Sequence, residues 1–239
     1  MKPFKNLLGY GTRPLVTLLL VTLFFSACKK NDPELVTQAA SGLMAFNLAA
    51  DKEAIGFTLS GNQLGNQPLG YSNFTGGYLP VFVGKREVRS FDFSSGSTIV
   101  ISNGNFVDSM YYSLFLVGIN GQYRNILVKD ELDTLEVITG KAWVRYINAI
   151  PDSSATPVIT IGESISSENA PYATVSAFKP VNAGAVNINI NNNGNIAASR
   201  PVTLEANKIY TVIFSGIPGQ SDPSKAVQIR FIQNGTVTP

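Results

Sequence analysis

The residue types that carry most catalytic chemistry are scarce in this 239-residue sequence, which has no histidine and one cysteine, Cys28. Without histidine, Ser-His-Asp and Cys-His catalysis and histidine-ligated metal sites are excluded. No glycine-rich phosphate loop is followed by a helical pattern. The composition therefore predicts a protein that is not an enzyme and that carries neither a cofactor nor a metal.

Paired carboxylates are the remaining route to catalysis, because glycoside hydrolysis needs only two of them. The densest acidic group is Asp130, Glu131, Asp133 and Glu136. It lies between two repeated segments, so we interpret it as a solvated linker. A weak calcium site and a carboxylate-dependent hydrolase are the remote alternatives, although the glycine that calcium loops use for their sharp turn is missing.

Aromatic residues are the other candidate functional groups. Tyr71, Phe74 and Tyr78 lie among Gly, Ser and Asn in the loop-like stretch 70–80. Rigid rings with a hydrogen-bonding hydroxyl suit adaptable binding surfaces, and sugars stack on such rings. Rings near strand ends usually fill the open end of a sandwich, so we interpret these three residues as core or loop packing, with contact to a glycan or an envelope protein as the alternative.

The N-terminal 27 residues have the layout of a secretory signal peptide. Basic residues precede an apolar run over residues 15–25, and small residues precede Cys28. The run is too short for a comfortable bilayer span, which needs about 20 apolar residues. The sequence Phe25-Ser26-Ala27-Cys28 resembles the lipobox of bacterial lipoproteins, which implies cleavage before Cys28 and lipidation of that cysteine, palmitate included. An ordinary signal peptide with an unmodified cysteine is the alternative.

Residues 28–41 show no apolar periodicity, and we interpret them as the lipidated cysteine and a tether. Once the signal peptide is removed, fifteen basic and sixteen acidic residues remain, a net charge of −1. A near-neutral chain gives no electrostatic footprint for nucleic acid. The expected location is the cell envelope, on the outer membrane, with the bilayer as a partner through the lipid on Cys28.

An internal repeat organises the rest of the chain. Four landmarks recur at offsets of 98 to 101 residues: Leu43–Asp51 with Val144–Asp152, Tyr71 with Tyr172, Gly84 with Gly184, and Tyr112–Gly121 with Tyr210–Gly219. The repeat predicts two similar domains, 42–136 and 141–239.

Both repeats have the pattern of β-structure. Val186, Ile188 and Ile190 alternate with asparagines, as in a half-buried strand, and Asn193-Gly194 then favours a type I′ hairpin turn. The fold class is therefore all-β, with two tandem immunoglobulin-like antiparallel β-sandwiches. The alternative is one larger sandwich or barrel to which each half contributes a sheet. Trp143 is expected in a core or between the domains.

A family resemblance rests on motifs of the second repeat. They are the strand Ala142–Asn148 with its Pro151-Asp152 turn, then Ala170-Pro171-Tyr172, Val181-Asn182-Ala183-Gly184 and Ile209-Tyr210-Thr211-Val212. These motifs resemble the bacterial family known as domain of unknown function 4397. The resemblance implies a β-sandwich on exported or surface proteins and transfers no catalytic residue. The first repeat departs from it, with Ala50-Asp51 in place of the Pro-Asp turn.

Three functions follow as hypotheses: a non-catalytic binding or adhesion module, a structural spacer of an envelope assembly, and, remotely, the hydrolase. The repeat also makes a structural prediction. Leu114 and Leu116 should match Val212 and Phe214 and face inward, with Tyr112 and Tyr210 on the same face and their hydroxyls hydrogen-bonded.

Overall fold

The computed structural model describes residues 38–152 and 154–238. The predicted signal peptide, Cys28 and most of the predicted tether lie outside the described residues. Within the described ranges the chain is built of strands with one short 3-10 turn, η2 (Leu132–Thr134). No helix in these ranges is long and apolar enough to cross a membrane.

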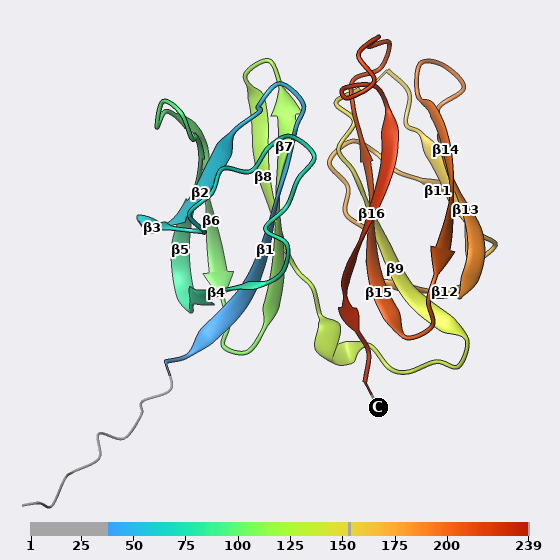
Figure 1. Ribbon diagram of the computed structural model, residues 1–239, viewed down its shortest axis with the longest axis horizontal. Helices are drawn as coiled ribbons and strands as arrows, with labels where there is room; N and C mark the ends of the chain where they lie inside the picture. Colours follow the sequence, from blue (N-terminus) through green and yellow to red (C-terminus); the bar gives the residue numbers. More distant parts are fainter. Residues whose placement is uncertain (1–37, 153, 239) are drawn as a thin grey trace, which may run out of the picture. The chain divides into compact units, whose positions relative to one another are not determined.

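Eight strands form a first sandwich of two four-stranded sheets (Figure 1). The inner sheet has the order β4-β1-β7-β8 and the outer sheet the order β3-β2-β5-β6. The strands are β1 (Ala40–Ala49), β2 (Ile55–Leu59), β3 (Asn62–Gln63), β4 (Leu79–Phe82), β5 (Gly84–Asp92), β6 (Thr98–Phe106), β7 (Tyr111–Ile119) and β8 (Gln122–Lys129).

A second sandwich repeats this topology strand for strand. Its inner sheet has the order β12-β9-β15-β16 and its outer sheet the order β11-β10-β13-β14. The strands are β9 (Lys141–Asn148), β10 (Val158–Ile161), β11 (Ile165–Asn169), β12 (Lys179–Asn182), β13 (Gly184–Asn191), β14 (Ala197–Leu204), β15 (Lys208–Ser215) and β16 (Gln228–Thr236). The fold class is confirmed, and each repeat holds both sheets of its own sandwich, so the alternative of one sheet per repeat is wrong.

One pair of strands in each sandwich departs from the antiparallel expectation. β1 runs parallel to β7, and β9 runs parallel to β15. Parallel neighbours cannot be joined by a hairpin, and here β2 to β6 lie between β1 and β7 in sequence, as β10 to β14 lie between β9 and β15. All other pairs are antiparallel.

Each sandwich has its own apolar core, as the repeat predicts. Leu114, Leu116 and Tyr112 are buried in the first core, and Val212, Phe214 and Tyr210 are buried in the second. The Tyr112 hydroxyl accepts a hydrogen bond from the amide of Val107, and the Tyr210 hydroxyl accepts one from Glu205. The predicted equivalence of these strands is confirmed.

A pair of buried asparagines closes the same turn in both sandwiches. Asn47 and Asn148 are fully buried. The Asn47 amide donates to the carbonyls of Lys52 and Leu69, and the Asn148 amide donates to that of Ala170. Each side-chain oxygen accepts a backbone N–H two residues on. A buried amide needs such partners, which explains why this asparagine recurs in the repeat.

The expected type I′ turn at Asn193-Gly194 is wrong. β13 and β14 pair up to Asn191 and Ala197, so the connection is a five-residue loop. Asn193 has a positive φ, but Gly194 does not, whereas a type I′ turn needs both. The Asn192 side chain instead accepts the amides of Gly194 and Ile196 and holds the wider loop.

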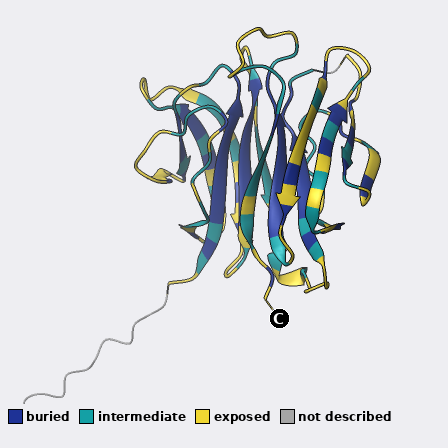
Figure 2. Ribbon diagram, turned by 45° about the vertical axis from the view of Figure 1, so that its right-hand side comes forward, coloured by how far each residue is buried: buried dark blue, intermediate teal, exposed yellow. Residues whose placement is uncertain are grey.

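A third apolar cluster joins the two sandwiches through their inner sheets (Figure 2). Phe46 and Phe115 of the first sandwich pack with Ile147 and Ile213 of the second. The rings of Phe46 and Phe115 are stacked with centroids 4.6 Å apart. The inner sheets are therefore buried on both faces, and residues 39–239 form one compact unit.

Candidate functional site

A buried ion pair crosses the junction between the inner sheets. Arg145 on β9 is 2% exposed and Asp130, just after β8, is 1% exposed. Arg145 Nη1 lies 2.5 Å from Asp130 Oδ1. Asp130 was expected in a solvated linker, and that expectation is wrong for this residue. Burying such a pair is costly unless hydrogen bonds satisfy its remaining polar atoms.

Four further polar side chains complete a closed ring of hydrogen bonds around this pair. Asp130 Oδ2 accepts from Tyr78 and from Ser113, at 2.5 and 2.7 Å. Arg145 Nε donates to Thr211 at 3.0 Å. Thr211 then donates to the Asn234 side chain, whose amide donates to the Tyr78 hydroxyl.

Aromatic rings flank the ion pair, and the side chains of Arg145 and Asp130 are almost fully buried. The Arg145 guanidinium lies 4.6 Å from the centroid of Phe178 and 5.8 Å from that of Phe115. Burial and the neighbouring Asp130 charge raise the pKa of Tyr78 above its ordinary value, so its hydroxyl remains a donor. Arg145 and Asp130 thus saturate each other, and the site presents no free charge from either residue.

The residues of this hydrogen-bonded ring occupy positions that correspond between the two repeats, but the residue types at those positions differ. Met44 and Arg145 occupy corresponding positions 101 residues apart. Ser113 pairs with Val128 as Thr211 pairs with Ile232, so Asp130 and Asn234, each two residues further along the chain, occupy corresponding positions. The counterpart of the ion pair is a contact of 3.9 Å between the Asn234 amide and the Met44 sulfur. One half of the junction is ionic and the other half is neutral.

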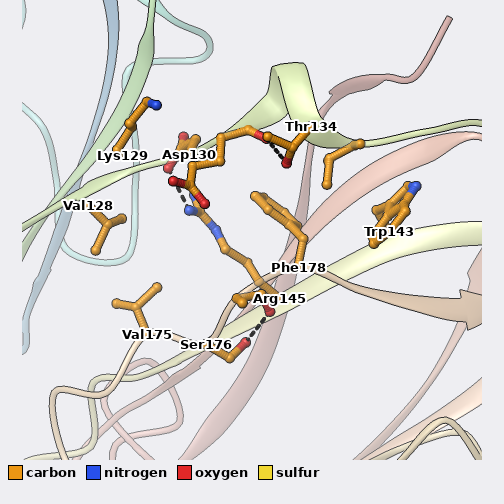
Figure 3. Close-up of a pocket in the computed structure, with 12 residues that line it drawn as sticks. Val128, Lys129, Asp130, Thr134, Trp143, Arg145, Val175, Ser176 and Phe178 are labelled. Carbon is orange, nitrogen blue, oxygen red and sulfur yellow. Dashed lines mark hydrogen bonds and ion pairs between the residues drawn. The ribbon is translucent and has the colours of Figure 1, made fainter. Parts of the chain in front are cut away.

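A pocket of about 600 Å³ opens on the ionic side (Figure 3). We call it the Trp143 pocket. Its walls come from the end of β8, the linker, β9 and the segment before β12, and the lining residues used below are Lys129, Asp130, Glu131, Trp143, Arg145 and Phe178. Lys129 and Glu131 are exposed. Together with Arg145 and Asp130, they give the lining of the pocket two positive and two negative groups and no net charge.

Trp143 forms one wall of this pocket and packs on the linker. It is partly buried, and its indole N–H donates to the carbonyl of Glu136 at 2.9 Å. This bond holds the indole against the linker, and the side chain also lines the pocket. Figure 3 shows Trp143 on one side of Phe178 and Arg145 on the other. A pocket that has an aromatic wall and no net charge suits an uncharged polar ligand rather than an anion.

The three aromatic residues for which ligand contact is the alternative lie in the junction, in three different surroundings. Phe74 stacks on Phe46 at 5.6 Å within the shared core. Tyr78 belongs to the polar ring. Tyr71 lines a separate pocket of about 410 Å³ that also holds Arg230, and burial raises the pKa of its hydroxyl. The structure does not bring the three rings onto one exposed surface, and their role in ligand contact stays a hypothesis.

The rest of the acidic group behaves as a linker. Glu131, Asp133 and Glu136 are exposed. Across residues 38–152 and 154–238, no group of three or more His, Cys, Asp or Glu side chains is placed to hold a metal ion.

Comparison with protein families tests whether the second sandwich belongs to the family that its motifs resemble. Residues 142–236 match the family model described as Domain of unknown function (DUF4397). The resemblance expected from the motifs is thereby confirmed for this segment. The DUF4397 segment begins on β9 and ends on β16, so it holds Trp143, Arg145 and Phe178. No protein of curated function matches the chain.

A solved structure that matches is the crystal structure of a candidate cell adhesion protein from Bacteroides eggerthii DSM 20697. It is 12% identical to this chain, and the match covers 83% of this chain and 96% of that one. At a TM-score of 0.21 the likeness supports no inference about function.

Sequence reasoning missed Arg145, Phe178 and the burial of Asp130. One signal was present in the repeat itself. Arg145 is a charge in a strand whose neighbours are apolar, at the position where the first repeat has Met44. A buried charge of this kind requires a partner from elsewhere in the fold. The partner's identity depends on how the two sandwiches meet, which the sequence pattern does not specify.

Proposed function

We propose that this protein is a non-catalytic binding protein of the cell envelope, anchored by lipid on Cys28, and that the Trp143 pocket takes a glycan. The observation that carries the proposal is the pocket itself, with its aromatic wall, its balanced charges and its rigid base. Sugar rings present an apolar C–H face to an aromatic ring and hydroxyls to polar groups. The hydrogen-bonded Arg145 and Asp130 lie buried beneath the pocket and hold its walls in place.

The fluorescence of Trp143 offers a direct test, because it is the only tryptophan in the chain. The mature chain with Cys28→Ser is screened on a glycan array, and hits are titrated by fluorescence and calorimetry. Binding should be lost in Trp143→Ala and largely retained in Trp143→Phe, which keeps a ring. Tyr111→Ala, outside the pocket, serves as the control. Silence across the array, or binding that Trp143→Ala leaves unchanged, would contradict the glycan proposal.

The anchoring part of the proposal has an independent test. Cells that express the chain are fed labelled palmitate, and Cys28→Ser is the matched control. The expected result is label on the wild-type chain alone and release of the Cys28→Ser chain from the membrane fraction. Label on both proteins would refute lipidation of Cys28, and protease shaving of intact cells then reports whether the outer surface is reached.

A spacer is the second candidate, and the rigid junction favours it. The two sandwiches are held together by the packing of Phe46 and Phe115 against Ile147 and Ile213. A spacer of fixed length would need such a junction. If the protein is a spacer, cells whose protein lacks residues 141–239 should be impaired, whereas cells that carry the Trp143→Ala protein should not be. The binding proposal expects both changes to impair the cell.

A further inference from the structure

Three exposed apolar side chains surround the start of β1. Phe82 is 44% exposed, Val107 48% and Tyr111 45%. Each touches the first residues of that strand: Phe82 pairs with Ala40, the carbonyl of Val107 accepts the Ser41 hydroxyl, and Tyr111 pairs with Gly42. We call Phe82, Val107 and Tyr111 the tether-end patch. Figure 1 shows the start of β1, the β4–β5 connection and the β6–β7 loop at the same end of the first sandwich.

The second sandwich provides an internal comparison for this patch. Asn182 stands where the first sandwich has Phe82, because it pairs with the first residue of β9 as Phe82 pairs with the first residue of β1. Glu205 stands where the first sandwich has Val107, because both amides donate to corresponding tyrosine hydroxyls. The same frame therefore carries polar, exposed residues in the second copy. The fold does not require apolar residues at these two positions.

The charges around the patch are compatible with lipid headgroups. Lys85 is exposed at the start of β5, and the Arg86 guanidinium lies 5.7 Å from the centroid of the Phe82 ring. Asp108 is the acidic residue beside Val107, and its carboxylate accepts the amide of Ala40. Aromatic rings next to basic side chains are typical of protein surfaces at a membrane interface.

We infer that the tether-end patch rests on the bilayer that holds the lipid of Cys28. The inference depends on the proposed anchoring. The nine residues 29–37 join that cysteine to the described chain, which begins two residues before β1, and an extended chain of this length reaches at most about 35 Å. The patch therefore lies around the one point of the described chain that the anchor keeps near the membrane. A sandwich held this way has its β5–β6 turn at the end that points away from the membrane.

Site-specific fluorescence quenching tests this orientation. Lipidation blocks Cys28, so an introduced cysteine is the only free thiol. Val107→Cys in the patch, Ser94→Cys at the β5–β6 turn and Glu205→Cys at the matched position are labelled with an environment-sensitive dye. Each lipidated protein is reconstituted into phosphatidylethanolamine and phosphatidylglycerol vesicles that contain a headgroup-region spin-labelled lipid.

The dye at Val107→Cys should be quenched severalfold more strongly than the dye at Ser94→Cys, with Glu205→Cys below Val107→Cys. Adding Phe82→Ser and Tyr111→Ser should remove this difference while circular dichroism stays unchanged. Equal quenching at the first two sites, or no effect of the double serine change, would overturn the inference and leave the anchoring intact. Protein that fails to float with vesicles would overturn the anchoring and the inference together.

Discussion

The ion pair between Arg145 and Asp130 gives the sharpest test of how the junction is built. Changing Arg145 to methionine removes its bonds to Asp130, Ser113 and Thr211 and leaves the carboxylate without its cation. Breaking a buried pair by removing one partner costs about 3–5 kcal/mol. For a unit of this size, a loss of that order lowers the Tm by about 10 °C. Asp130→Asn alone should cost a similar amount, because it strands the guanidinium.

The double variant Arg145→Met, Asp130→Asn should recover most of the loss. It installs on the ionic side the pair that the other half already uses, Met44 with Asn234. We expect its free energy of unfolding to lie within about 2 kcal/mol of the wild-type value, because replacing a whole buried ion pair is often nearly neutral. The coupling between the two changes would then be at least about 4 kcal/mol.

Urea unfolding of the Cys28→Ser chain, followed by circular dichroism and by Trp143 fluorescence, measures all four proteins. Arg200→Met is the control, since Arg200 is exposed and, among the described residues, its guanidinium donates to the backbone carbonyl of Ile229 and forms no ion pair. It should cost less than about 1 kcal/mol. If the double variant is as unstable as the sum of the single changes, the correspondence of the two halves is wrong. If Arg145→Met costs nothing, the burial of the pair is wrong.

Three further outcomes are expected. Gly118→Ala should destabilise by at least about 2 kcal/mol in urea, because the residue has a positive φ and a Cβ would collide with the following turn, whereas Gly76→Ala, also at positive φ but in open space, should cost about 1 kcal/mol. Cleavage by a glutamate-specific protease after the exposed Glu136 should give two fragments that co-elute in size-exclusion chromatography and separate only in denaturant; fragments that separate without denaturant would contradict the junction. Burial, and then the Glu168 charge, raise the pKa of Tyr146 to about 12, so its neutral form is favoured in the folded state and the Tm should fall as the pH rises from 10 toward 12; a Tm that is flat across this range would contradict it.

The strands and the two cores were predictable because their signals are local and occur twice. The alternation of Val186, Ile188 and Ile190 with asparagines marks a strand with one buried face, and the structure buries Ile188 and Ile190. The repeat then fixed which strands correspond. The loop after this strand was predicted wrongly, because the dipeptide Asn193-Gly194 favours a tight turn while the Asn192 side chain stabilises a wider one.

The junction was not predicted, although the sequence contained a sign of it. Residues 43–50 and 144–150 are almost continuously apolar, which is typical of strands buried on both faces rather than on one. An isolated sandwich would leave one face of its inner sheet in water. Which sheet meets which, and hence the partner of Arg145, is a property of tertiary packing and has no local signature.

The two sandwiches share one frame, so the positions where they differ indicate where each has its own task. Trp143 corresponds to Gly42, at an offset of 101. In the first sandwich a side chain at Gly42 would collide with the Tyr111 ring, which itself packs edge-on against Tyr78 at 4.9 Å. In the second sandwich the ring stands on β9 instead and walls the pocket beside Arg145. The paired residues are Gly42 and Tyr111 in the first copy and Trp143 and Ile209 in the second, so the first copy has an aromatic ring exposed at the tether end and the second has a lined pocket. These corresponding positions tolerate different residues because the side chains of each sandwich's own core lie on the other face of its inner sheet. The proposed binding site and the proposed membrane contact therefore lie at positions that correspond between the two sandwiches but carry different residues.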